Sequence, residues 1–294
     1  MTAKIIDGKK IALRIRAGIR SELLMLAKCA HHSKPMLAVV SVGNNSASEI
    51  YALSQKALFL DLGIGYRPVV LPGTSSEKNI IKTIKKLNND TSVTGIMLQM
   101  PLPKTINSQK IRLAIKPEKD AEGITPHNLG MLAYSGAQLS VAPCTASAVM
   151  ECIKSTGATI KGKEAVIVGH SEIVGKPLCL MMLSSALSSA TPTVCHIATK
   201  NLKNHTKRAE ILIAAVGIPN FIRKDMVKKG AIVIDVGINR LKNKITGDVD
   251  FAGVKKTAGY ITPVPGGVGA VTTAILARNL ISLYKSQTVR VDKK

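Results

Sequence analysis

Short aliphatic runs alternate with segments of helical periodicity along most of this chain of 294 residues. In the first half, apolar runs begin at Met36, Tyr66 and Val93, and the segments between them predict helices over about 46–62 and 76–87. Apolar runs of strand length that are separated by helices are typical of βαβ units, whose strands form a parallel sheet. The pattern therefore predicts an α/β fold.

A second alternation follows residues 101–143, which are rich in Pro, Gly and Asn. Its apolar runs begin at Glu164, Thr191, Glu210 and Gly230, and they predict a second parallel sheet. Two such sheets suit the chain length, because domains average roughly 150 residues. We expect the irregular stretch between them to contain a domain junction or the loops of a site.

These patterns divide the chain into two predicted domains. Residues 1–143 form the first and residues 144–270 form the second. The last apolar helix, within about 271–294, is expected to pack back on the first domain and complete it. The molecule would then have two lobes.

Charge and cysteine content bear on partners and compartment. The chain carries 41 Lys and Arg against 18 Asp and Glu, and its net charge of +23 favours nucleic acid, a membrane surface or anionic metabolites. A basic surface without any partner is the alternative. No apolar stretch approaches the ~20 residues that span a bilayer, and the five cysteines form no metal-ligand pattern. We therefore expect a soluble cytoplasmic protein with no metal and no membrane partner.

A glycine-containing turn follows the predicted strand that ends at Val168. The turn contains Gly169 and Gly175 and leads into a helix, so that backbone N–H groups and the positive helix end would face a phosphate. It does not match GxGxxG, and an ordinary strand-to-helix turn is the alternative. Further glycine turns at 215–219 and 235–239 would end on the same sheet edge. This convergence favours a nucleotide crevice there.

Polar residues of the first domain form a second group of candidates. Tyr51 and Gln55 lie on one face of a predicted helix, Gln99 follows an apolar strand, and Asp120 and Glu122 lie in a polar loop. An amphipathic helix with incidental polar residues and a loop with turn-capping carboxylates are the alternatives. The six histidines are scattered, and each is more simply a surface or packing residue.

The residues together resemble the bifunctional methylenetetrahydrofolate dehydrogenase/methenyltetrahydrofolate cyclohydrolase family. The resemblance covers nearly the whole chain and is carried, in the family's order, by VGNNSASEIY, LQMPLP, KPEKDAEGITPHNLGML, PCTA, IVGHSEIVGKP, TKNL, GAIVIDVGINR, GDVDF and ITPVPGGVG. It implies an N-terminal folate-binding catalytic α/β domain, a Rossmann-type NAD(P)-binding domain with a cleft between them, and a homodimer. No helix-turn-helix, aromatic-studded strand or zinc module supports a specific nucleic-acid partner.

The resemblance also implies a coenzyme site. The phosphates of the coenzyme would lie on the turn of Gly169, His170 and Ser171, and the turn of Ile238 would approach the nicotinamide. His170 and Ile197 stand where some family members place an arginine and a serine against the NADP phosphate. The family resemblance makes NADP the expected coenzyme, and these two replacements keep NAD as the alternative.

The resemblance places the tetrahydrofolate substrate over Tyr51 and near Gln99, with its pterin edge on Glu122. A carboxylate suits that edge because it accepts paired hydrogen bonds from a ring N–H and an amino group. Glu122 stands where the family has a shorter aspartate, and Ala146 stands where it has a proline.

The largest departure is Gln55, which occupies the position of the lysine in the family's Tyr-x-x-x-Lys motif. A glutamine can neither supply nor take a proton, and Lys56 should point away because one helical step turns a side chain by ~100°. We therefore expect oxidation of methylenetetrahydrofolate to persist and hydrolysis of the methenyl product to be very slow. The alternative is a catalytically weakened relative that acts as a ligand-binding or interaction protein.

Overall fold

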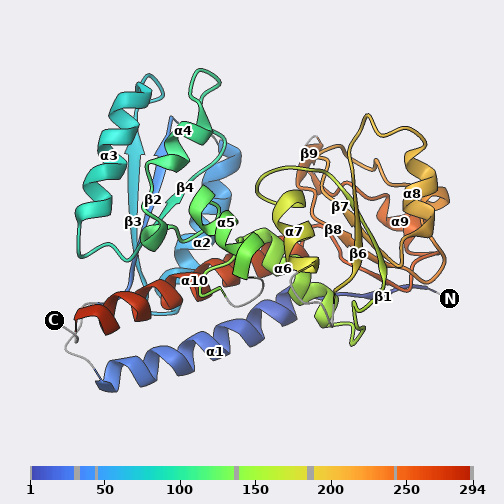
Figure 1. Ribbon diagram of the computed structural model, residues 1–294, viewed down its shortest axis with the longest axis horizontal. Coiled ribbons are helices and arrows are strands. Elements are labelled where there is room, and N and C mark those ends of the chain that lie inside the picture. The colour runs from blue at the N-terminus through green and yellow to red at the C-terminus, as the bar shows by residue number, and fades with distance from the viewer. Residues whose placement is uncertain are drawn as a thin grey trace. The chain divides into compact units, whose positions relative to one another are not determined.

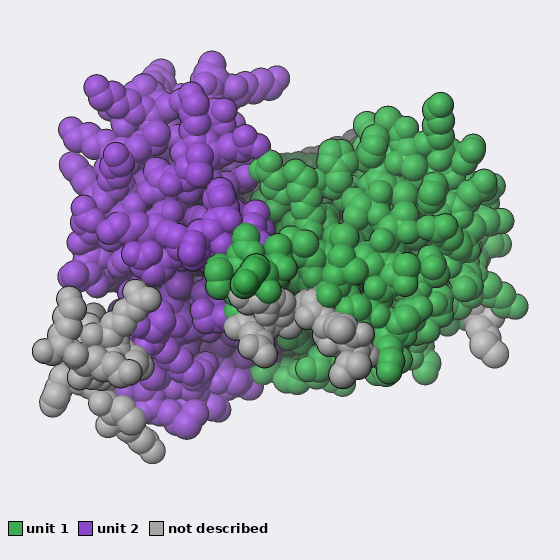
Figure 2. Space-filling model, viewed as in Figure 1, with its two compact units in different colours: residues 1–14, 130–139, 143–275 green, residues 15–129, 140–142, 276–294 purple. Residues whose placement is uncertain are grey.

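The computed structural model describes residues 2–29, 34–43, 46–135, 139–183, 189–241 and 244–291. The chain forms two compact units (Figure 2). Unit 1 contains residues 1–14, 130–139 and 143–275, and unit 2 contains residues 15–129, 140–142 and 276–294. Each unit has its own parallel sheet, so the predicted two-domain α/β architecture is confirmed.

Unit 1 is built on a six-stranded sheet in which every neighbouring pair is parallel. The strand order is β1 (Lys4–Ile5), β11 (Tyr260–Ile261), β8 (Ile232–Asp235), β7 (Ile211–Ala214), β5 (Glu164–Val168) and β6 (Thr191–Cys195). From β5 the chain adds β6 on one side and β7 on the other. The order therefore reverses between β5 and β7, where open α/β sheets form their ligand crevice.

Helices and short segments connect these strands (Figure 1). They are α6 (Cys144–Lys154), α7 (Gly175–Met182), α8 (Leu202–Arg208), η2 (Lys224–Met226), the β9 (Asn239–Leu241) and β10 (Lys244–Thr246) hairpin, and α9 (Phe251–Val254). The helix α5 (Pro126–Ser135) contributes residues to both units. Strand side chains such as Val166, Leu212 and Val233 are fully buried beneath the connecting segments. Parallel strands covered in this way are continuous apolar runs, which is why the sequence showed them clearly.

Unit 2 contains a three-stranded parallel sheet in the order β3 (Gly65–Leu71), β2 (Met36–Val42) and β4 (Gly95–Leu98). It also contains α2 (Ser46–Asp61), α3 (Glu77–Asn89), α4 (Ser108–Leu113) and η1 (Pro117–Lys119). Alternate residues of the strands, among them Val40 and Ile96, pack with Ile80 and Ile84 of α3. The opposite face of β4 therefore carries Met97 and the residue that follows the strand.

Two long helices, α1 (Gly8–Cys29) and α10 (Val268–Val291), contribute residues to both units. In unit 2, Asn279 of α10 donates hydrogen bonds to the carbonyls of Ala121 (3.0 Å) and Ala142 (2.8 Å). A Cβ on Gly95 of β4 would lie 2.6 Å from Leu280 Cδ1. The C-terminal helix α10 therefore contacts β4 and the segments of unit 2 that contain Ala121 and Ala142.

The two units do not divide the chain at residue 143. The first 14 residues belong to unit 1, because β1 pairs with β11 through Lys4 opposite Tyr260 and Ile5 opposite Ile261. No helix within the described ranges is long and apolar enough to cross a membrane.

Candidate functional site

The turn after β5 is shaped by two glycines that admit no side chain. Gly169 has a φ of +129°, and a Cβ there would lie 2.1 Å from the carbonyl oxygen of Ala215. A Cβ on Gly175 would lie 1.9 Å from the carbonyl oxygen of Gly169. The backbone of β5, the turn after β7 and the start of α7 therefore approach one another closely. Close packing of a strand end, a neighbouring turn and a helix start around glycines is typical of nucleotide-binding turns.

The remaining residues predicted for the coenzyme lie on the same carboxyl edge of the sheet. Ser171 is exposed, and its Oγ accepts a hydrogen bond from the N–H of Val174 (3.2 Å). Ile197 follows β6 and Ile238 follows β8, and both side chains are 64% exposed. Exposed isoleucines at strand ends are poorly explained by core packing, so they are available to contact a ligand.

His170 lies edge to face with His196, with 5.1 Å between ring centroids. Both side chains are exposed, and His196 Nδ1 accepts a hydrogen bond from the N–H of Ala198 (3.2 Å). The sequence indicated a surface or packing residue, and His196 is exposed, directly after β6, the strand next to β5.

A buried carboxylate, which sequence reasoning missed, holds this edge together. Asp248 is fully buried, and its Oδ2 accepts hydrogen bonds from the N–H groups of Val216 (2.6 Å) and Gly217 (2.9 Å) after β7. Its Oδ1 accepts one from Asn239 Nδ2 (2.8 Å) after β8. The Asp248 side chain thereby holds together the turn after β7 and the turn after β8.

Asp235, at the end of β8, supports Asp248 in turn. Its carboxylate accepts hydrogen bonds from the N–H groups of Gly237 (3.0 Å), Asp248 (2.9 Å) and Val249 (3.0 Å). Burial, and to a lesser degree the charge of Asp248, raises the pKa of Asp235 to about 6. The sequence feature that could have identified Asp235 is an Asp at the end of an otherwise apolar strand. A carboxylate buried at such a position requires several hydrogen-bond donors.

In unit 2, Gln99 follows β4 at the point where the strand order reverses. Its backbone N–H donates to the carbonyl of Val40 (2.8 Å), and its Nε2 donates to the carbonyl of Met100 (3.3 Å). The Oε1 atom is buried and has no hydrogen-bond partner among the described residues. Buried acceptors are nearly always satisfied, so this oxygen marks a place for a ligand or a water.

Gln55 lies on the side of β4 that carries Met97. It is 1% exposed, donates from Nε2 to Met97 Sδ (3.3 Å) and accepts at Oε1 from the hydroxyl of Tyr66 (3.1 Å). Its neighbour Lys56 is exposed, as the helical rotation predicted. The side chain of Tyr51, the other predicted residue of α2, lies outside the described residues.

Glu122 is partly buried beside the end of β4. Its Oε2 accepts a hydrogen bond from the N–H of Leu98 (3.3 Å). Burial raises the pKa of Glu122 to about 7, and the charge of Asp120 adds to the rise, whereas Arg112 opposes it. A carboxyl group with a pKa near neutrality is typical of a functional site.

Asp120 has a different role from Glu122. It is 1% exposed and accepts hydrogen bonds from the N–H groups of Gly123 (2.9 Å) and Thr125 (2.7 Å) and from Asn128 Nδ2 (2.9 Å). These contacts match the turn-capping alternative for this loop. Asp120 therefore shapes the loop that presents Glu122.

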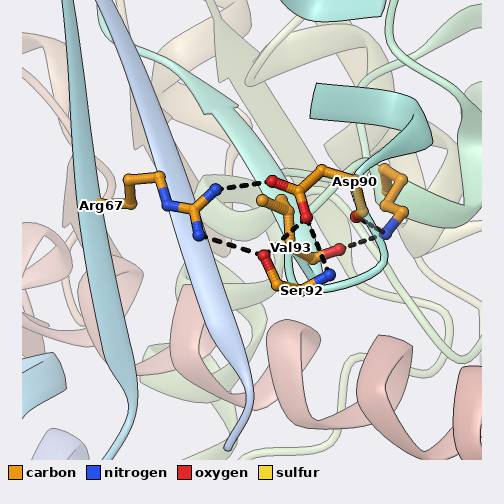
Figure 3. Close-up of polar contacts among 5 residues, drawn as sticks. Arg67, Asp90, Ser92 and Val93 are labelled. Carbon is orange, nitrogen blue, oxygen red and sulfur yellow. Dashed lines mark hydrogen bonds and ion pairs between the residues drawn. The ribbon is translucent and has the colours of Figure 1, made fainter. Parts of the chain in front are cut away.

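A polar cluster anchors the segment that leads into this loop (Figure 3). Arg67 Nη1 pairs with Asp90 Oδ2 (2.7 Å), and Arg67 Nη2 donates to Ser92 Oγ (3.0 Å). Lys119 donates from Nζ to the carbonyls of Asp90 (3.2 Å) and Val93, and its burial lowers its pKa. The cluster ties β3, the turn before β4 and the residue before Asp120 together.

The carboxyl edges of the two sheets carry different kinds of groups. The edge in unit 1 has a turn shaped by glycines with exposed side chains around it. The edge in unit 2 has an unsatisfied amide oxygen and a carboxyl group whose pKa is near neutrality. Within the described ranges, no group of three or more His, Cys, Asp or Glu residues could hold a metal ion. These features define a nucleotide-binding α/β protein with a second site formed by side chains.

Comparison with known families agrees with this description. Residues 6–122 match the catalytic domain of tetrahydrofolate dehydrogenase/cyclohydrolase, and residues 143–288 match the NAD(P)-binding domain of the same family. The bifunctional protein FolD of Fusobacterium nucleatum is 44% identical over 282 residues, which cover 96% of this chain and 98% of that protein.

Solved structures lead to the same family. The bifunctional enzyme FolD of Campylobacter jejuni, a methylenetetrahydrofolate dehydrogenase/cyclohydrolase, is 39% identical with a TM-score of 0.90, over 97% of this chain and 99% of that one. The Trypanosoma brucei enzyme, complexed with NADP cofactor and an inhibitor, is 32% identical with a TM-score of 0.93, over 99% of both chains. This chain belongs to the tetrahydrofolate dehydrogenase/cyclohydrolase family.

Proposed function

We propose that this protein oxidises methylenetetrahydrofolate to methenyltetrahydrofolate with NADP and hydrolyses the methenyl product very slowly. Family membership over nearly the whole chain supports the first part. The observation that carries the second part is Gln55, a neutral amide with both ends engaged inside the protein. The proposed protein is therefore a dehydrogenase on a bifunctional scaffold.

The residues of unit 1 fit a dinucleotide. The glycines let the ends of β5 and β7 and the start of α7 pack closely. We propose that the turn from Gly169 to Ser171, at the start of this helix, holds the phosphates. His170 and Ile197 would flank the adenosine end, and Ile238 the nicotinamide end, where a bound coenzyme accepts the hydride. NADP is favoured because a relative was solved with it, and NAD is the alternative.

The residues of unit 2 would hold the folate. The free Oε1 of Gln99 offers an acceptor to the substrate, and the carboxylate of Glu122 accepts the paired N–H donors of the pterin edge. Tyr51 would lie against the rings. Hydride transfer depends chiefly on placing the reacting carbon, a task that these residues perform without moving a proton.

Hydrolysis imposes a further demand. Water attack on the methenyl carbon requires a group that manages protons on the water and on the departing ring nitrogen. Gln55 has no ionisable proton, and its amide is already bonded to Met97 and Tyr66. Lys56 is exposed, so it does not replace the missing amine at this position. The hydrolytic step should therefore lose ~10²–10⁴-fold in rate.

A purified-protein assay that follows the two reactions separately tests this proposal. Coenzyme reduction with methylenetetrahydrofolate reports the dehydrogenase, and the decay of added methenyltetrahydrofolate above its spontaneous rate reports the hydrolase. We expect a clear first signal, greater with NADP than with NAD, and a very weak second one. Failure of both reactions in a folded sample that still binds folate would favour the weakened-relative interpretation.

We also propose a cytoplasmic homodimer. Among the cysteine side chains that the structure describes, Cys144, Cys152, Cys179 and Cys195 form no disulfide, as in proteins of reducing compartments. Among the described strands of unit 1, β6 lies at a sheet edge and carries a partly exposed Val194 (38%). Unpaired strand edges favour association with another chain. Light scattering coupled to size-exclusion chromatography tests this proposal. We expect the mass of two chains, and the mass of one chain would contradict the dimer.

A further inference from the structure

Unit 1 contains a pocket of about 660 Å³ that the folate reaction does not use. It lies between the end of α8, the η2 segment, the start of α9 and the turns before β8 and β11 (Figure 1). Its lining residues are Lys207, Arg223, Lys224, Asp225, Val227, Lys228, Lys229, Asp250 and Thr257. Five of these nine side chains are cationic.

The positive charge of this pocket is only partly neutralised, because five cationic side chains face two carboxylates. Asp225 is already paired with Lys203 outside the pocket (2.5 Å), and Asp250 caps α9 by accepting from the N–H of Gly253 (3.1 Å). Among the described residues, none of the five cationic side chains of the pocket forms an ion pair. Like charges held close together repel one another, so an anion that enters the pocket relieves this repulsion.

The pocket and the coenzyme turns lie at opposite edges of the sheet. Lys207, Lys229 and Thr257 come shortly before β7, β8 and β11, whereas Gly169 and Ile238 follow β5 and β8. Because all these strands are parallel, residues that precede them and residues that follow them are separated by the length of the strands. An anion bound in the pocket would therefore not occupy the coenzyme site.

We propose that this pocket binds a compact anion with two or more phosphate groups. Its volume lies within the roughly 300–1,000 Å³ of small-molecule sites. Lysines and an arginine from three segments converge on it, which suits phosphates on one small ligand. An extended nucleic-acid backbone fits less well, because these cationic side chains are gathered in a single pocket of about 660 Å³. Val227 and Thr257 are the uncharged residues of its lining.

Titration calorimetry with inorganic tripolyphosphate tests the proposal on the full chain saturated with NADP. The pocket variant carries Lys207→Gln and Lys229→Gln, one in the last turn of a helix and one in a loop. The control variant carries Lys154→Gln and Lys161→Gln, which have the same two settings in unit 1, are exposed and line no part of the pocket. Both variants retain the backbone contacts of the wild type, and circular dichroism would verify their folding.

We expect tripolyphosphate to bind the NADP-saturated wild type and control equally, and the pocket variant at least about tenfold more weakly. The expected signal does not depend on folate turnover, so it stands or fails apart from the proposed activity. Absence of binding, loss of binding on adding NADP, or equal weakening in both variants would each overturn the proposal. Tighter binding of duplex DNA than of tripolyphosphate at physiological salt, lost in the pocket variant, would assign the pocket to nucleic acid instead.

Discussion

At the carboxyl edge of the six-stranded sheet, Gly169 and Asp248 shape the backbone itself. At the edge of the three-stranded sheet, Gln55, Gln99 and Glu122 instead present side chains. A site made of backbone tolerates changes in the surrounding side chains, such as His170 and Ile197 in unit 1. A site made of side chains changes its chemistry with a single substitution. On the proposed function, the hydrolase step depends on a side chain that differs here, whereas the coenzyme turn depends on backbone.

The largest expected effect follows from Gln55→Lys. An amine at this buried position restores a group that can take and give protons, so hydrolysis of methenyltetrahydrofolate should rise about 100-fold or more. Gln55→Met is the matched control, because it fills a similar volume without an amine. Coenzyme reduction should change much less than hydrolysis in either variant. Equal hydrolysis rates for Gln55→Lys and Gln55→Met would show that this side chain does not limit the step.

Gly169→Ala tests the backbone-built site. The added Cβ would meet the carbonyl of Ala215 at 2.1 Å, so the turn must move, and NADP binding should weaken about 100-fold. Gly162→Ala is the control, since Gly162 also has a positive φ (+67°) but has open space around its Cβ. It should cost only about 1 kcal/mol of stability. Unchanged NADP affinity in a folded Gly169→Ala protein would place the phosphates elsewhere.

Glu122→Gln tests the side-chain-built site. Loss of a charge-assisted pair should weaken folate binding by roughly ten- to a hundredfold, and NADP binding should stay constant. Because the pKa of Glu122 is raised to about 7, the carboxylate forms only as the pH rises through 7. Folate affinity of the wild type should therefore increase between about pH 6 and pH 8, and the variant should lose this increase. Glu118→Gln, an exposed change in the same loop, should keep it.

The smallest expected effect concerns Asp90, in the polar cluster that anchors the loop of Glu122 in unit 2. Hydrogen bonds from Ser92 and Arg67 lower the pKa of Asp90 from 3.8 to about 2. A depressed folded-state pKa stabilises the protein above the unfolded pKa, and this contribution is lost as the pH falls from about 4 to 2. Asp90→Asn should lower the free energy of unfolding at pH 7 by about 1 kcal/mol or less, because the pair is partly exposed. Urea titrations should show this difference vanish near pH 2.

Much of the architecture was predictable because buried parallel strands such as β5 and β7 are uninterrupted apolar runs. The sequence did not predict α1, whose exposed Leu13, Leu24 and Met25 blur its periodicity. Nor did it predict β1, because its partner β11 lies at the other end of the chain. Pairing between such distant residues leaves no local signal.

The candidate site was predictable to a similar degree. Motif order pointed to Gln99 and Glu122, and the structure adds the free oxygen of one and the raised pKa of the other. Asp235 and Asp248 were missed because their partners are backbone N–H groups that only the folded chain brings together. Burial and hydrogen bonding of a carboxylate are tertiary properties, so residue type alone does not reveal them.

The most direct test of the difference between the backbone-built site and the side-chain-built site is one progress curve of the wild-type protein. The reaction contains methylenetetrahydrofolate and NADP in a buffer where methenyltetrahydrofolate is stable. Reduced coenzyme and methenyltetrahydrofolate are measured together. If the protein with Gln55 catalyses hydride transfer but hydrolyses the methenyl product very slowly, methenyltetrahydrofolate should accumulate almost mole for mole with reduced coenzyme. Formyltetrahydrofolate should then form much more slowly than reduced coenzyme. Formyltetrahydrofolate that appears as fast as reduced coenzyme, with no accumulation of the methenyl compound, would contradict the account.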